Sequence, residues 1–106
     1  LGGKRDETID RGDVRIDLPR RTVEVRGQLV QLTFVEFELL ALLAASPGVV
    51  YSRRQLLERL RGGADYREPR TIDVHVRHLR EKIEQEPREP ELILTVRGAG
   101  YRFRDG

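Results

Sequence analysis

Polar and apolar residues alternate in three short segments near the start of the chain, at residues 14–18, 22–26 and 28–32. Such alternation is typical of strands that bury one face of a sheet. Pro19 and Gly27 lie in the two intervals between these segments, where tight turns are expected. The pattern therefore predicts a small antiparallel meander.

The spacing of apolar residues then changes to that of helices. The spacing of capping boxes occurs twice, at Thr33 with Glu36 and at Ser52 with Gln55. In a capping box each of the two side chains accepts a hydrogen bond from the backbone N–H of the other residue. The first box predicts a strongly apolar helix, with Phe34 in its first turn, that stops at Ser46, Pro47 and Gly48. The second box predicts a helix that continues to about residue 60.

A third helix is predicted from about Thr71 to Gln85, because Pro87 cannot continue it. Residues 92–96 and 101–104 then have the composition of two strands joined by a glycine-containing turn, which is a β-hairpin. Strands, three helices and a hairpin, in this order, predict an α+β fold of the winged helix-turn-helix kind, in which the hairpin is the wing.

The chain has 106 residues, which fits one small domain, and 38% of them are hydrophobic, enough for one modest core. Residues 1–12 are polar and without a period, so we expect a linker or flexible N-terminus followed by a domain at residues 13–104. The longest apolar run has seven residues, far below the roughly 18 that a membrane span needs, and no leader for export opens the sequence. Cysteine is absent, which suits a cytoplasmic protein.

The two faces of the third helix differ in chemistry. One face carries a stripe suited to packing on the other helices: Ile72, Val76, Leu79 and Ile83. The opposite face carries mostly long hydrogen-bond donors: Arg70, Val74, Arg77, His78 and Glu81. A helix in the DNA major groove needs such donors, small apolar groups for thymine methyls and few acids. A solvated amphipathic helix is the alternative, but it usually shows mixed charge pairs, whereas this face has one acid, so DNA binding is favoured.

Positive charge is concentrated in the second half of the chain, although the net charge is only +2. Residues 51–83 carry nine basic and five acidic side chains, and residues 92–104 carry three arginines and no acid. The acidic stretch 84–91 separates these two basic blocks. A basic face is typical of a protein that binds the phosphate backbone, and charge alone leaves an ordinary solvated surface as an equal alternative.

Enzymatic and metal-binding functions find little support in the sequence. No paired carboxylates, nucleophile–histidine–acid set or phosphate-binding glycine loop stands out, so we expect no catalysis. His75 and His78 lack a third histidine or a cysteine to complete a metal site, and no metal or cofactor is expected.

Three segments carry a resemblance to a known family: LTFVEFELLALLAASPGVVYSRRQLL, RTIDVHVRHLREKIE and ILTVRGAGYRF. They resemble the OmpR/PhoB-type DNA-binding domain of two-component response regulators, in order and across most of the chain. The resemblance implies a four-stranded N-terminal sheet, three helices and a C-terminal wing. It also implies sequence-specific binding to double-stranded DNA in transcription regulation, with the third helix in the major groove and the wing at the adjacent minor groove.

Carried over by position, the resemblance implies a set of DNA-contacting residues on the third helix: Arg70, Thr71, Val74, His75, Arg77, His78 and Arg80. It implies three more on the wing: Thr95, Arg97 and Tyr101. The loop at residues 63–69, from Gly63 to Pro69, matches a segment that contacts RNA polymerase in the family. A second copy of the chain is expected to bind beside the first on direct-repeat half-sites.

Two positions depart from the family pattern. The family often has a tryptophan at the position of Arg61, where it touches a phosphate, and the guanidinium could make that contact instead. Glu81 occupies a position that is often basic, where it could repel phosphate or pair with Arg77 one turn away. The chain begins in what resembles an interdomain linker, without the receiver domain and its phosphorylated aspartate, so we expect the effector part alone, with no phosphoryl chemistry.

Two further alternatives remain open at this point. A winged helix also serves as a protein-interaction module that never binds DNA. The same fold occurs in the cytoplasmic part of membrane-tethered activators. The donors on the outer face of the third helix, Arg70, Arg77 and His78, favour DNA binding over the first alternative, and the response regulator is preferred to the second.

Overall fold

The structure is a computed structural model that describes residues 7–60 and 69–105. Four strands come first: β1 (Thr8–Asp10), β2 (Val14–Asp17), β3 (Thr22–Val25) and β4 (Gln28–Val30). Three helices and a hairpin follow: α1 (Phe34–Ala45), α2 (Arg53–Arg59), α3 (Thr71–Ile83), β5 (Ile93–Val96) and β6 (Gly100–Phe103). This order confirms the predicted winged helix-turn-helix architecture.

The N-terminal sheet is an antiparallel meander with strand order β1-β2-β3-β4. Its last three strands confirm the three predicted strands, and burial alternates along β2 and β3, whose inner face includes Val14, Ile16, Val23 and Val25. In β4, Leu29 is 74% exposed. β1 corrects the expectation that residues 1–12 form only a linker or flexible end. Its residues pair with β2, from Thr8 opposite Asp17 to Asp10 opposite Arg15, and only Ile9 in this strand is partly buried. One apolar residue in three gives no visible period, so the pairing depends on the neighbouring strand.

α1 is the central helix of the fold. The Thr33–Glu36 capping box is present in both directions, with Glu36 N–H donating to Thr33 Oγ1 and Thr33 N–H donating to Glu36 Oε1. Most of the helix is buried, as its strongly apolar sequence predicts. Among its large apolar side chains Phe34 is exposed, at 51%, and the Arg21 guanidinium covers its ring at 4.5 Å from the centroid.

α2 and α3 complete the helix-turn-helix. The Ser52–Gln55 capping box opens α2, as predicted. α3 begins at Thr71 as expected but ends two residues before the predicted Gln85, because Glu84 already has an extended backbone. The predicted stripe of α3 is buried throughout: Ile72, Val76, Leu79 and Ile83.

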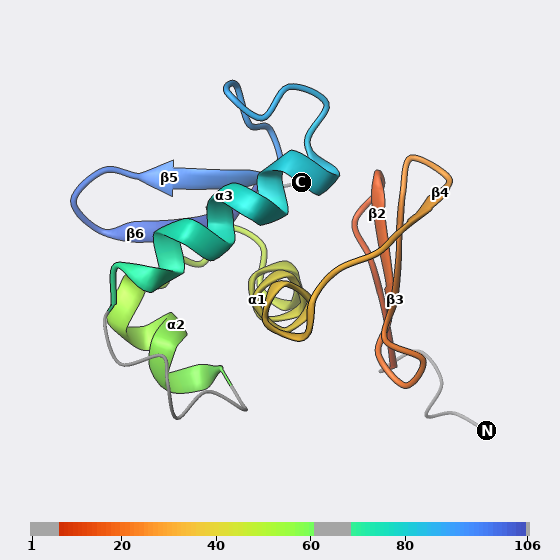
Figure 1. Ribbon diagram of the computed structural model, residues 1–106, viewed down its shortest axis with the longest axis horizontal. Coiled ribbons are helices and arrows are strands. Elements are labelled where there is room, and N and C mark those ends of the chain that lie inside the picture. The colour runs from red at the N-terminus through yellow and green to blue at the C-terminus, as the bar shows by residue number, and fades with distance from the viewer. Residues whose placement is uncertain (1–6, 61–68, 106) are drawn as a thin grey trace.

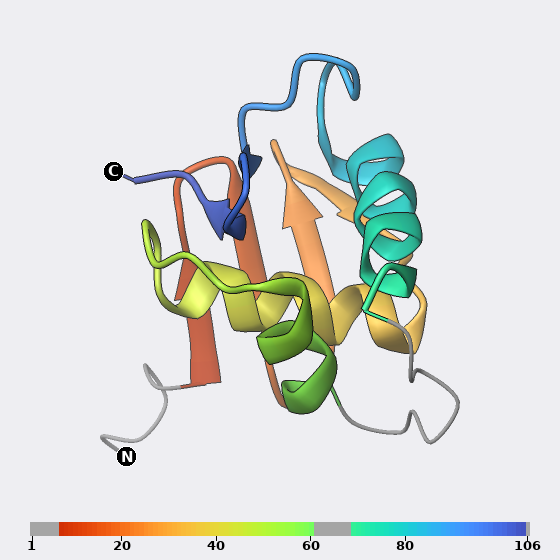
Figure 2. The same ribbon diagram turned by 90° about the vertical axis from the view of Figure 1, so that its left-hand side faces the viewer.

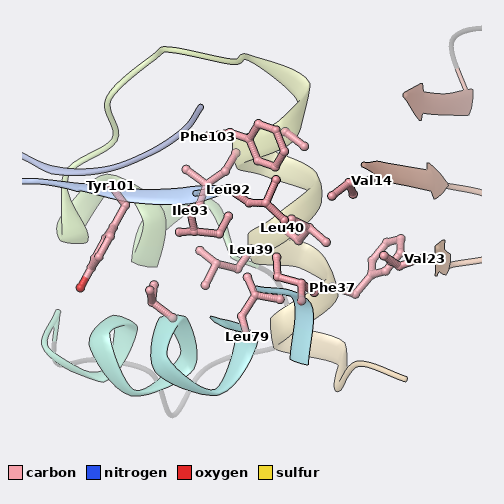
Figure 3. Packing of buried hydrophobic residues seen from close by; sticks show 14 of the residues in the cluster. Val14, Val23, Phe37, Leu39, Leu40, Leu79, Leu92, Ile93, Tyr101 and Phe103 are labelled. Atoms are coloured by element: carbon pink, nitrogen blue, oxygen red, sulfur yellow. The ribbon is translucent and has the colours of Figure 1, made fainter. Parts of the chain in front are cut away.

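The elements form layers around α1. Figure 1 shows the N-terminal sheet on one side of α1, with α3 and the β5–β6 hairpin on the other. Figure 2, turned by 90°, shows α1 crossing the sheet while α3 stands beside it. Side chains from the sheet, α1, α3 and the hairpin meet in one core, in which Leu39, Leu79, Ile93 and Phe103 lie between the layers (Figure 3).

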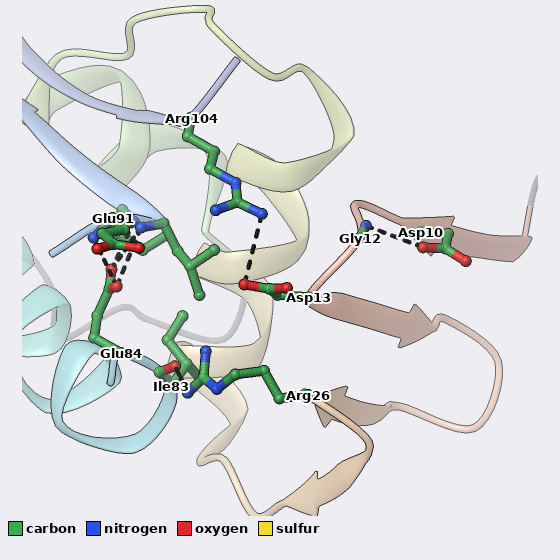
Figure 4. A network of polar contacts seen from close by, with 10 residues as sticks. Asp10, Gly12, Asp13, Arg26, Ile83, Glu84, Glu91 and Arg104 are labelled. Atoms are coloured by element: carbon green, nitrogen blue, oxygen red, sulfur yellow. Dashed lines mark hydrogen bonds and ion pairs between the residues drawn. The ribbon is translucent and has the colours of Figure 1, made fainter. Parts of the chain in front are cut away.

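Polar contacts join the N-terminal sheet to the rest of the fold (Figure 4). Arg26 and Gly27 form the β3–β4 turn with φ of 48° and 82°, and Arg26 Nη2 donates to the carbonyl oxygen of Ile83 at 2.8 Å. That bond satisfies a carbonyl at the end of α3. Arg104 Nη2 lies 3.7 Å from Asp13 Oδ2, which links the end of the hairpin to the start of β2. The sheet is therefore attached to both functional elements of the C-terminal half.

Candidate nucleic-acid interface

The outer face of α3 is open to solvent, as the sequence predicts. Arg70, Arg77 and His78 are exposed, and Val74 is 51% exposed although it is apolar. Thr71 and His75 are half-buried at the edges of this face. An exposed valine among hydrogen-bond donors is suited to contact with a thymine methyl.

Arg77 pairs with Glu81 one turn along the helix. Its Nε lies 3.5 Å from Glu81 Oε2, and the Arg77 side chain is 78% exposed. An exposed pair of this length contributes little to stability. The acid nevertheless holds the guanidinium along the helix, so of the two roles considered for Glu81, pairing is the one observed.

The wing presents Arg97 at its tip. Val96 lies opposite Gly100 in the hairpin, and residues 97–99 make the turn, in which the N–H of Ala99 donates to the carbonyl of Val96 at 2.9 Å. Arg97 and Thr95 are exposed. Gly100 is required at the base, because a Cβ there would lie 2.0 Å from the carbonyl oxygen of Tyr51.

Arg80 connects α3 to the wing instead of pointing freely outward. Its Nε and Nη2 donate to the carbonyl of Ile93 at 3.1 and 2.9 Å, and Nη2 also donates to Thr95 Oγ1 at 2.8 Å. Its guanidinium lies 5.6 Å from the centre of the Tyr101 ring. These bonds give Arg80 a structural role that its position on the flank of the helix did not reveal.

Tyr101 differs from the expectation of a wing residue that contacts DNA. Its ring is buried at 7% exposure, and its hydroxyl donates to Asp73 Oδ1 at 2.6 Å. Burial and this hydrogen bond to a carboxylate raise the pKa of Tyr101 to about 12. The side chain extends from β6 towards α3 (Figure 3), and it joins the wing to the helix from inside the fold.

Asp73, in the first turn of α3, is a functional candidate that was not among the predicted site residues. Arg53 of α2 binds it with two contacts, Nε to Oδ1 at 3.0 Å and Nη2 to Oδ2 at 3.0 Å. The one feature of the sequence that could have identified Asp73 is that it is the single acid in the first turn of a helix with a basic outer face. Its partners lie 20 and 28 residues away in the chain, so no local pattern identifies them.

A cleft of about 390 Å³ lies between the start of α2 and the wing. Ser52, Arg53 and Arg54 line it on the side of α2, and Thr95 and Tyr101 are among the residues that line it on the side of the wing. Arg53 and Arg54 were missed as candidates, because in the sequence they read only as part of a basic block. They place two basic side chains at the cleft beside the wing.

His75 lies half-buried at the edge of the outer face of α3. Burial lowers the pKa of His75, and the neighbouring His78 adds to this, while the charge of Glu36 acts in the opposite direction. The lowered pKa favours the neutral form of the imidazole. In the residues that the structure describes, no group of three or more His, Cys, Asp or Glu side chains could hold a metal ion.

Two of the predicted contact sites lie outside the described residues. Arg61 is one, and the other is the loop at 63–69 except for Pro69. Of the helices in the described ranges, none has the length and apolar character needed to cross a membrane.

An exposed third helix, packed on two others and flanked by a hairpin with arginine at its tip, defines a winged helix-turn-helix protein. A family model described as "Transcriptional regulatory protein, C terminal" matches residues 27–103. The chain belongs to this family, whose members include the OmpR/PhoB-type domains.

Individual relatives agree with this assignment. The DNA-binding response regulator MtrA of Mycolicibacterium smegmatis is 43% identical over 96 residues, which cover 91% of this chain and 42% of MtrA. The response regulator DrrB of Thermotoga maritima, an OmpR/PhoB homologue, has a similar structure with a TM-score of 0.85, at 36% identity over 93% of this chain and 45% of DrrB. The chain thus spans less than half the length of these two proteins.

One similar structure contains DNA. The RstA DNA-binding domain of Klebsiella pneumoniae, solved in complex with the RstA box, has a TM-score of 0.81 and 37% identity. The similarity covers 92% of this chain and 97% of that one.

Proposed function

We propose that this chain binds double-stranded DNA in a sequence-specific manner and is the effector part of a two-component response regulator. The observation that carries the proposal is the exposed face of α3, where Val74 lies among Arg70, Arg77 and His78 beside the wing. MtrA and DrrB are response regulators, and RstA was solved with its DNA box, which supports the same function here.

Each contact of the interface has a distinct role in this proposal. Val74, Arg77 and His78 enter the major groove and contact base edges. Arg70 and Thr71 contact the DNA from the N-terminal end of α3. Arg97 binds in the adjacent minor groove, where narrow A·T-rich stretches attract arginine.

A second group of basic side chains serves the phosphate backbone. Arg53 and Arg54 line the cleft between α2 and the wing, at the edge of the base-reading face. Arg61 is assigned to phosphate as well, in place of the tryptophan of other family members. Arg80 and Tyr101 act from within the fold by holding the wing against α3.

The assembly on DNA follows from the same hypothesis. Two copies bind direct-repeat half-sites about one helical turn apart, roughly 10–10.5 base pairs. The loop at 63–69 contacts RNA polymerase, and the protein acts in the cytoplasm without an enzymatic activity of its own.

Selection of bound sequences from a random duplex pool tests the proposal directly. We expect an enriched motif, and the affinity for that motif should fall steeply with salt, because phosphate contacts release counterions. No enrichment, together with an affinity that stays flat between low and physiological salt, would reject DNA binding in favour of a protein-interaction module.

A further inference from the structure

The Asp73 carboxylate is a junction of three elements. It belongs to the first turn of α3, and its two oxygens accept from Arg53 of α2 at 3.0 Å each. Its Oδ1 also accepts the hydroxyl hydrogen of Tyr101 of β6 at 2.6 Å. One acidic group therefore links both helices of the helix-turn-helix with the wing.

The position of the wing relative to α3 depends on side chains. The wing is bound to the segment before α2 by the backbone, since Tyr51 and Tyr101 exchange two N–H···O bonds of 2.9 Å. Within the described residues no backbone hydrogen bond joins α3 to the hairpin. Besides apolar packing, polar side chains connect them at three places within the described residues. Asp73 bonds Tyr101 near the start of α3, and Arg80 bonds Ile93 and Thr95 further along. Glu84, directly after α3, accepts from the N–H of Ile93.

We infer that Asp73 is a positioning residue for DNA binding, which through Tyr101 holds the wing at the angle to α3 that lets both contact one DNA site. This inference rests on the proposed function. A protein that inserts a helix in one groove and an arginine in the next must hold the two at a fixed separation, because flexibility between them is lost on binding. Figure 3 shows the Tyr101 side chain spanning the space between β6 and α3.

Electrostatics and positioning predict opposite effects when Asp73 is neutralised. A carboxylate beside a DNA-binding face repels phosphate, so its removal alone should strengthen binding to every duplex. If Asp73 is a positioning residue, it instead strengthens binding to the cognate site, where wing and helix act together, and not to other duplexes. Asp73→Asn should therefore lower the ratio of cognate to scrambled affinity by roughly tenfold, a size typical of residues within one hydrogen-bond network.

Two further variants separate the link from the charge. Tyr101→Phe keeps the buried ring and the net charge but removes the hydroxyl, and it should lower the same ratio in the same direction. Glu81→Gln removes an acid from the same helix, where the carboxylate pairs with Arg77 and does not reach the hairpin. It is the control for charge and should not affect the wing.

The decisive measurement is a double-mutant cycle between Asp73→Asn and Arg97→Ala, with binding measured by fluorescence anisotropy of labelled duplexes. Arg97 lies at the wing tip and does not touch Asp73, so coupling between them must pass through the hairpin. We expect Arg97→Ala to cost several-fold less cognate affinity in the Asp73→Asn background than in the wild type. With Glu81→Gln the two effects should be additive. A loss of stability alone does not create such coupling while every variant is folded, which circular dichroism verifies.

The outcomes distinguish this inference from the proposed function. Equal effects of Arg97→Ala in both backgrounds would overturn the positioning role of Asp73 and leave DNA binding intact. A wild-type domain that does not discriminate between duplexes would overturn the proposed function itself. Amide spectra without DNA give an independent check: Asp73→Asn should shift resonances of β5 and β6 and leave those of β2 and β3 in place, and an unchanged hairpin would also overturn the inference.

Discussion

Glu84 offers a strong test of how the wing is attached, because an acid from the predicted acidic stretch turns out to be buried. It is 7% exposed and directly follows α3. Its carboxylate accepts from three successive backbone N–H groups at the start of the wing: Glu91 at 2.8 Å, Leu92 at 3.1 and 3.0 Å, and Ile93 at 2.8 Å (Figure 4). We expect Glu84→Ala to destabilise the fold strongly.

The magnitude follows from what the three donors lose. The N–H groups of Leu92 and Ile93 are buried and would be left without an acceptor, at about 1–3 kcal/mol each. The N–H group of Glu91 is reached by water and costs little. The free energy of unfolding should therefore fall by roughly 3–4 kcal/mol, a large part of the roughly 5–15 kcal/mol that a small domain has. Glu84→Gln keeps one carbonyl acceptor and should lose about half as much.

Urea unfolding followed by far-UV circular dichroism measures this difference. Glu89→Ala is the matched control, since Glu89 is an exposed acid in the same loop, and it should change the free energy of unfolding by no more than about 0.5 kcal/mol. If Glu84→Ala proves as mild as Glu89→Ala, the backbone at the start of β5 does not depend on the carboxylate, and this reasoning is refuted.

Further predictions concern binding, assembly and acid stability. Arg77→Ala should cost about 1–3 kcal/mol of binding free energy on the cognate duplex and relax the base preference, whereas Arg61→Ala should weaken binding to all duplexes alike and lower the salt slope by about one. Titrations of cognate and scrambled duplexes at several salt concentrations measure both effects. If the two variants show each other's pattern, Arg61 contacts bases and Arg77 contacts phosphate. The isolated domain should sediment as a monomer at micromolar concentration, and a stable dimer without DNA contradicts this. Burial alone would raise the pKa of Glu36, but hydrogen bonds from Lys82 and the Thr33 backbone outweigh it and lower the pKa. Glu36 then contributes stability above the ordinary glutamate pKa of about 4.3, and this stability is lost as pH falls through the lower folded value. The midpoint of urea unfolding should therefore fall less steeply with decreasing pH in Glu36→Gln than in the wild type. Parallel curves for the two proteins would argue against this role.

The candidate interface was predictable where its residues share one element. The stripe of α3 and the donors opposite it follow from helical periodicity, so the exposure of Val74, Arg77 and His78 follows from the sequence pattern alone. The resemblance to the OmpR/PhoB type added the expectation that Thr95 and Arg97 of the wing contact DNA. It also carried over Tyr101 as a DNA contact, which stays a prediction; the structure shows that this side chain is buried and bonds Asp73 inside the fold.

The sequence by itself determined what depends on neighbours a few residues apart. Both capping boxes, the buried stripe of α3 and the hairpin turn require only local geometry, because helices and tight turns close their hydrogen bonds within the segment. The alternation in β2 and β3 likewise requires only a period of two.

Only the tertiary structure decided which distant groups meet. β1 exists because β2 offers it an edge, and Arg26 reaches a carbonyl 57 residues away at the end of α3. Asp73 and Glu84 look alike in the sequence, as acids at the two ends of one helix. One is placed beside Arg53 and the Tyr101 hydroxyl, and the other beneath the backbone N–H groups of the wing. A charged or polar group that folding removes from water must find a partner, and that partner is set by the path of the whole chain.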